Sequence, residues 1–145
     1  HLWGLHEETT ATGVRGVDAT DSVETATSAA VSLARWTGGA VAVSGATDFI
    51  TDGRWDVRVS GGSPFFPLIT GAGCSLGGVM AVYTASGTPL VAALTGAALF
   101  KLAGQQAERE AVGPAHFQGR FLDALYRIAP EELAAHPFLV EETKP

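Results

Sequence analysis

The stretch Thr70–Gly78, TGAGCSLGG, decides how this chain is interpreted. A glycine-rich turn leads directly into an apolar run that predicts a helix from about Gly73 to Ala85. Backbone N–H groups in the first turn of a helix have no partner within the helix and carry partial positive charge. Because glycines let a phosphate approach these groups closely, the stretch predicts an anion site. Glycines that only allow close packing are the alternative interpretation.

Cys74 lies in the first turn of this predicted helix and is the single cysteine of the chain. A helix N-terminus stabilises a thiolate, which can act as a general base on a substrate hydroxyl or as a covalent nucleophile. The alternative is a small hydrophobic side chain that only packs. One cysteine excludes a disulfide framework and a multi-cysteine zinc site, and it suits a reducing cytosol.

The residues before this stretch predict a helix, a strand and a hairpin. A helix opens at Asp21, with Glu24 completing a capping box, and ends at Gly38-Gly39. Residues 40–43 are short, apolar and bounded by glycines, which predicts a buried strand of the parallel type. The dipeptide Asp52-Gly53 between two strand-like arms, 48–51 and 54–59, predicts a hairpin.

The residues after it predict two more helices. One follows Pro89, and the other carries Pro114 in its first turn and ends by Pro130. Residues 1–15 are expected to form a loop region and residues 130–145 a polar tail with at most one short helical turn. The whole is α/β, with only one candidate for a central parallel strand, so it resembles part of a sheet rather than a complete one.

Composition bounds the function. The 145 residues fit one domain. Charged residues make up 17% of the chain, below the roughly 25% typical of globular proteins, so we expect much of its surface to be covered by its own core or by other chains. The net charge of −6 and the lack of a Lys/Arg cluster exclude nucleic acid and a polybasic membrane anchor as partners. No charge lies between Arg58 and Lys101, but residues 86–89 (SGTP) interrupt this run, which favours buried helices over a membrane span.

The remaining polar candidates carry less weight. The four histidines show no metal-ligand spacing, so no metal site is predicted on them. Lys101 ends an apolar helical face, where it either extends from the core to solvent or reaches a nucleotide; the first interpretation is preferred.

Several motifs together resemble one enzyme family. Residues 70–74 are similar to the anion-hole motif of the ribokinase-like superfamily, and cysteine in the place of the usual aspartate resembles the thiamin-biosynthetic kinases. The stretches 16–22, 41–45, 48–53, 113–117 and 121–125 resemble hydroxyethylthiazole kinase in the same order. The resemblance covers about residues 14–129 and implies a three-layer α/β/α ribokinase-like fold, present as its C-terminal portion within a single kinase domain.

The resemblance also implies site residues and partners. Cys74 corresponds to the catalytic residue, Ser44 and Gly45 to residues that bind ATP, and Gly71 to a glycine that contacts the substrate. Backbone amides of Gly71, Ala72, Gly73 and Cys74 correspond to the anion hole. The implied activity is transfer of the γ-phosphoryl group of ATP, with Mg²⁺, to the hydroxyl of 4-methyl-5-(2-hydroxyethyl)thiazole, by a cytoplasmic homotrimer in thiamin biosynthesis.

Members of that family are about twice this length. Their N-terminal half supplies most strands, the main thiazole contacts and an Asn-x-x-Glu segment tied to Mg²⁺, so the chain is expected to need that half and to be inactive alone. Two alternatives stay open. One is a related kinase for hydroxymethylpyrimidine or another small alcohol, and the other is an inactive truncated fragment or interface subunit.

Overall fold

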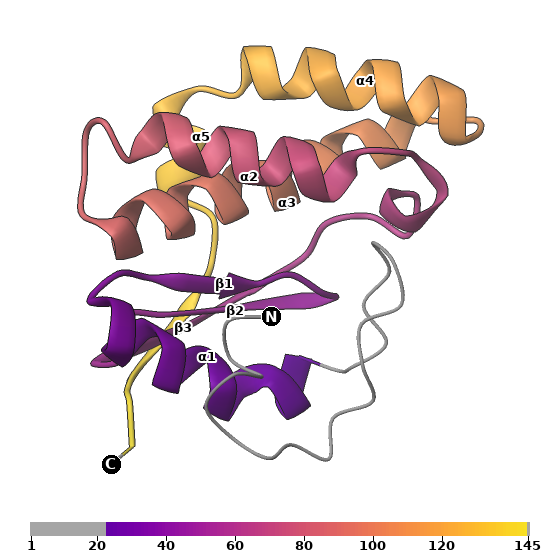
Figure 1. Ribbon diagram of the computed structural model, residues 1–145. Helices are drawn as coiled ribbons and strands as arrows, with labels where there is room; N and C mark the ends of the chain where they lie inside the picture. Colours follow the sequence, from indigo (N-terminus) through magenta and orange to yellow (C-terminus); the bar gives the residue numbers. More distant parts are fainter. Residues whose placement is uncertain (1–22, 145) are drawn as a thin grey trace.

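The computed structural model describes residues 23–144, which form three layers (Figure 1). A four-stranded sheet lies in the middle, with one helix on one face and four helices on the other side. The helices are α1 (Val23–Thr37), α2 (Ala72–Tyr83), α3 (Pro89–Glu110), α4 (Pro114–Arg127) and α5 (Pro130–Ala134). The strands are β1 (Val41–Val43), β2 (Thr47–Thr51), β3 (Trp55–Ser60) and β4 (Leu139–Glu142). The α/β class and the layered arrangement predicted from the sequence are therefore confirmed.

The sheet has the order β1-β2-β3-β4, and each neighbouring pair is antiparallel. The prediction of a buried parallel strand at residues 40–43 is wrong for the pairing described here. β1 pairs with β2 in the register Val41↔Thr51 and forms one edge of the sheet, where Ala42 is exposed. The reason is the short turn after Val43, because a three-residue connection can only reverse the chain, whereas a parallel neighbour needs a long crossover.

The predicted hairpin is confirmed, with its turn one residue later than expected. β2 and β3 pair as Thr51↔Asp56, so Gly53 and Arg54 occupy the central positions. Gly53 has a φ of 83°, which favours glycine, and Asp52 Oδ1 accepts hydrogen bonds from the backbone N–H groups of Arg54 and Trp55. Arg35 of α1 donates from Nε to the Gly53 carbonyl at 3.0 Å, which ties the turn to the helix.

The helix boundaries follow the local signals. α1 ends at Thr37 and is followed by Gly38, whose φ is 68° and whose N–H donates to the Ala34 carbonyl at 2.9 Å. α3 and α4 begin at Pro89 and Pro114 as predicted, and Thr88 caps α3 by accepting from the Val91 N–H. The predicted capping box at Asp21 and the loop region 1–15 lie outside the described residues.

Two apolar clusters hold the layers together. One lies between the sheet and α3, where Ile50, Val57 and Val59 meet the alanines at positions 93, 97 and 98. The other is aromatic and joins α3 to α4 through Phe100, Phe117 and Phe121. α1 covers one face of the sheet and α3 packs on the other, while α2 and α4 pack on α3 (Figure 1).

The polar tail predicted for residues 130–145 contains more structure than expected. After α5, β4 pairs with β3 in the register Val57↔Val140, and Thr143 donates to Asp56 Oδ1 at 2.7 Å. His136 is buried, with its Nε2 3.2 Å from the Ser60 carbonyl oxygen. The strand escaped prediction because all of its side chains are exposed, so it shows no buried face.

The uncharged run between Arg58 and Lys101 forms α2 and the first half of α3. Among the described residues, no helix has the length and apolar character that crossing a membrane requires.

Candidate nucleotide-binding site

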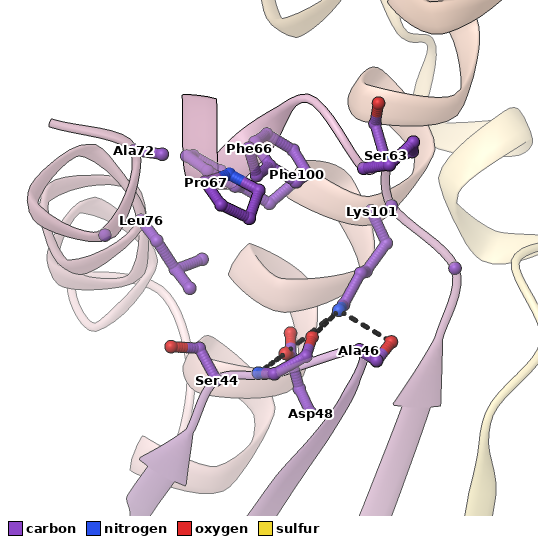
Figure 2. A pocket seen from close by; sticks show the side chains of 15 residues that line it. Ser44, Ala46, Asp48, Ser63, Phe66, Pro67, Ala72, Leu76, Phe100 and Lys101 are labelled. Atoms are coloured by element: carbon purple, nitrogen blue, oxygen red, sulfur yellow. Dashed lines mark hydrogen bonds and ion pairs between the residues drawn. The ribbon is translucent and has the colours of Figure 1, made fainter. Parts of the chain in front are cut away.

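A pocket of about 610 Å³ opens between the sheet and the helical layer (Figure 2). Five parts of the chain line it: the turn between β1 and β2, the start of β2, the loop after β3, the first turns of α2, and the middle of α3. The lining residues are Ser44, Gly45, Ala46, Asp48, Gly61, Gly62, Ser63, Pro64, Phe66, Pro67, Ala72, Gly73, Leu76, Phe100 and Lys101. Segments separated by more than fifty positions in the sequence therefore line the same pocket.

The first turn of α2 presents free backbone donors to this pocket. Gly71 precedes the helix with a φ of 86°, and no side chain caps this end of the helix. A Cβ atom at Gly71 or Gly73 would meet nothing within 4 Å, so the space before the helix is open. Because first-turn N–H groups lack helical partners, the amides of Ala72 and Gly73 are available to an anion at the pocket wall.

Another wall of the pocket, next to the first turn of α2, is apolar. Phe66, in the short helix η2 (Phe66–Leu68), stacks on Phe100 with ring centroids 5.5 Å apart. Its ring lies over Gly104, where a Cβ atom would come within 2.6 Å of Phe66 Cζ. Glycine at position 104 is thus what lets the loop after β3 fold down on α3. Figure 2 shows Phe66, Pro67 and Phe100 grouped above the charged residues of the pocket.

The floor carries a buried ion pair. Lys101 Nζ lies 3.0 Å from Asp48 Oδ1, and their side chains are only 7% and 4% exposed. The ammonium group also donates to the carbonyl oxygens of Gly45 and Ala46. As Figure 2 shows, the Lys101 side chain reaches from α3 down to the turn that carries Ser44.

The structure brings most of the predicted site residues together. Ser44, Gly45, Ala72 and Gly73 all line this pocket. Gly71 and Cys74 do not line it, although they flank Ala72 and Gly73, and Cys74 is exposed. Two of the predicted residues thus lie in the turn after β1 and two in the first turn of α2, with Cys74 following directly on the latter.

Sequence reasoning missed two of the charged residues here. The preferred interpretation of Lys101, a side chain extending to solvent, is wrong because the ammonium group is buried against Asp48. Asp48 was assigned only to a strand. A usable signal existed: Lys101 is the first charge after a long uncharged run, and a buried lysine needs a carboxylate partner.

The histidines have structural roles where they are described. His116 Nε2 accepts from Arg120 Nε at 3.3 Å, and His136 bonds the Ser60 carbonyl. His1 and His6 lie outside the described residues. Within residues 23–144, no three His, Cys, Asp or Glu side chains gather in a way that could hold a metal ion.

The chain is similar to known proteins over most of its length. The model of the hydroxyethylthiazole kinase family matches residues 5–131. A hydroxyethylthiazole kinase of Bifidobacterium animalis subsp. lactis is 48% identical over 132 residues, which cover 86% of this chain and 44% of the relative. One of Cereibacter sphaeroides is 44% identical over 119 residues, or 82% of this chain and 45% of the relative.

A solved structure gives the same result. That of the hydroxyethylthiazole kinase protein from Pyrococcus horikoshii OT3 superposes with a TM-score of 0.74 at 30% identity. The match covers 83% of this chain and 47% of the solved one. The chain thus spans about half the length of the relatives it matches.

Proposed function

The chain belongs to the hydroxyethylthiazole kinase family, and from that premise we propose that the full-length protein is an ATP-dependent kinase. Its acceptor is the primary hydroxyl of 4-methyl-5-(2-hydroxyethyl)thiazole, and the product is the thiazole phosphate used in thiamin biosynthesis. The names of its relatives support the thiazole alcohol as the acceptor.

One observation carries the proposal at the level of the site. The uncapped first turn of α2 and the Ser44–Ala46 turn face the same pocket from two sides. A phosphate chain seated there meets the helical amides on one side and the Ser44 hydroxyl on the other. Phosphoryl transfer depends chiefly on such positioning and on stabilisation of the negative charge that spreads over the transferring group.

Each candidate residue then has a defined role. Ser44 and Gly45 contact the phosphates of ATP, and Gly71 contacts the thiazole alcohol near its hydroxyl. Cys74 takes the hydroxyl proton while the substrate oxygen forms its bond to the γ-phosphorus and the bond to ADP breaks. The amides of residues 71–74 hold the oxygens of the transferring phosphoryl group.

The residues described here suit ATP better than Mg²⁺. The free amides and the glycines fit phosphate oxygens, and the apolar wall of Phe66 and Phe100 provides a surface for a flat ring. Mg²⁺ in such sites takes phosphate oxygens, waters and one or two carboxylates, and Asp48, the carboxylate of this pocket, is already paired with Lys101. No step of the mechanism is therefore assigned to a metal held by residues 23–144.

The active assembly is expected to need more than this chain. Because the chain spans about half of its relatives, the remaining thiazole contacts are proposed to come from the rest of the protein, which is proposed to form a trimer. Light scattering of the full-length protein measures the trimer directly, and a monomer mass would contradict it.

The test of the activity is a coupled assay on the full-length protein. With ATP, Mg²⁺ and the thiazole alcohol, we expect equal amounts of ADP and thiazole phosphate. The same assay with hydroxymethylpyrimidine serves as the control for substrate class. Turnover of the pyrimidine in preference to the thiazole would contradict the substrate, and no turnover of either would contradict the activity.

A further inference from the structure

Lys101 has no ammonium proton left for a ligand. An ammonium group has three donors, and here three oxygens receive them: Asp48 Oδ1, the Gly45 carbonyl and the Ala46 carbonyl. The first and last of these lie 3.0 Å and 3.1 Å from Nζ. Although Lys101 lines the pocket, its charge is therefore used to hold protein groups.

Asp48 holds the same turn from the other side. Its Oδ1 accepts a hydrogen bond from the Gly45 N–H at 2.8 Å, in addition to the ion pair with Lys101. Both polar groups of the Gly45 peptide backbone are thus bound by this pair of side chains. Water cannot easily replace either contact, because Asp48 and Lys101 are both buried.

The residues held in this way, Gly45 and Ala46, connect Ser44 to the start of β2. Residues 44–46 are all exposed at the edge of the pocket. Without the buried pair, β1 and β2 alone would not determine the orientation of this turn, since Val43↔Phe49 is the last pair of the ladder beside it. The pair links the turn to α3, the central helix of the molecule, and so fixes the Ser44 hydroxyl relative to the first turn of α2.

We infer that Lys101 and Asp48 are positioning residues for the nucleotide: they set the Ser44–Ala46 turn at the place where it meets the phosphate chain. This inference rests on the proposed kinase function. It predicts that loss of the pair raises KM for ATP and leaves KM for the thiazole alcohol unchanged. A pair that served only stability would change the fraction of folded enzyme and leave both Michaelis constants as they are.

The experiment uses the full-length enzyme with three variants: Asp48→Asn, Lys101→Met, and the double variant Lys101→Met/Asp48→Leu. Each single change leaves a buried group unpaired, whereas the double change replaces both charges with apolar groups and so preserves folding. Melting temperature, kcat and KM are measured for each, with ATP and the thiazole alcohol varied in turn. Binding of a non-hydrolysable ATP analogue is measured by calorimetry.

In the folded double variant, KM for ATP is expected to rise about tenfold or more, because a displaced contact group loses its geometry with the phosphates. KM for the thiazole alcohol should stay within about twofold. Arg120→Met is the matched control, since Arg120 forms an exposed ion pair with Glu110 at 3.1 Å and lines no part of this pocket. Its constants should equal those of the unaltered enzyme.

The outcomes separate this inference from the proposed function. An unchanged KM for ATP, or an equal rise in both constants, overturns the positioning role. If the double variant does not fold, Asp48→Asn decides the question by the same two constants. If the unaltered protein binds the ATP analogue but phosphorylates neither alcohol, the proposed activity fails, and weaker analogue binding by the variants still supports the positioning role.

Discussion

Cys74 combines an exposed position with the first turn of a helix that opens with glycines. Its Sγ lies on the helix whose preceding residues, Ala72 and Gly73, line the pocket. The thiol is exposed and belongs to neither apolar cluster, and the chemical role assigned to it is the one proposed above. An acceptor hydroxyl beside this turn would meet Cys74 and the helical amides together.

Replacement of Cys74 tests this role. We expect Cys74→Ala to lower kcat of the full-length enzyme by about 10²-fold or more, because no group then takes the hydroxyl proton. Cys74→Asp should retain activity, since a carboxylate at the same place can also accept a proton. Steady-state kinetics with the thiazole alcohol measures both, and a kcat for Cys74→Ala equal to that of the unaltered enzyme would remove Cys74 from the mechanism.

At the scale of elements, the contact between α2 and α3 depends on one glycine. A Cβ atom at Gly96 would lie 2.6 Å from Met80 Cγ and 3.1 Å from Met80 Cα, so the two helices touch almost backbone to backbone. Met80 also packs against both apolar clusters. The position of α2, and with it the helical wall of the pocket, therefore depends on the absence of a side chain at Gly96.

Two glycine-to-alanine changes in helix interiors should have opposite effects. Gly96→Ala is expected to lower the free energy of unfolding by about 1–3 kcal/mol, because α2 must shift to admit the methyl group. Gly119→Ala in α4, where a Cβ atom meets nothing within 4 Å, should raise it by up to about 1 kcal/mol through helix propensity. Urea unfolding followed by circular dichroism measures both free energies of unfolding. Equal changes in the two variants would show that the close α2–α3 contact at Gly96 does not contribute to stability.

At the scale of the whole molecule, the aromatic cluster that joins α3 to α4 also supplies the apolar wall of the pocket. Phe66 and Phe100 line the pocket, and both rings pack on Phe121, with centroids 5.2 Å and 4.7 Å away. Phe121 comes from α4, the helix on the far side of α3 from the sheet. Stability and the shape of the site are therefore coupled through this one cluster.

Truncation of Phe121 should change both properties. We expect Phe121→Ala to lower the free energy of unfolding by about 3–5 kcal/mol, since it leaves a cavity among three rings. Phe121→Leu, which fills most of that volume, is the milder control. Thermal unfolding and KM for ATP are measured together, and a large loss of stability with no change in KM would show that the wall does not depend on the core.

Features that depend on neighbours along the chain could be predicted from the amino-acid sequence. The hairpin at Asp52-Gly53, the helix starts at Pro89 and Pro114, and the glycine turn before α2 all follow from backbone preferences of a few adjacent residues. The order of the motifs also identified the family, because Ser44, Gly45 and the 70–74 stretch occur in the expected sequence.

Features that join distant positions depend on how the chain folds and could not be predicted from local patterns. β4 has no buried face of its own and exists through its pairing with β3, and β1 is antiparallel because a short turn returns it to β2. Lys101 meets the Gly45 carbonyl 56 positions away, a contact that no local pattern records. The physical reason is that burial and charge pairing depend on which surfaces meet, whereas turns and helix ends depend on the dihedral angles of single residues.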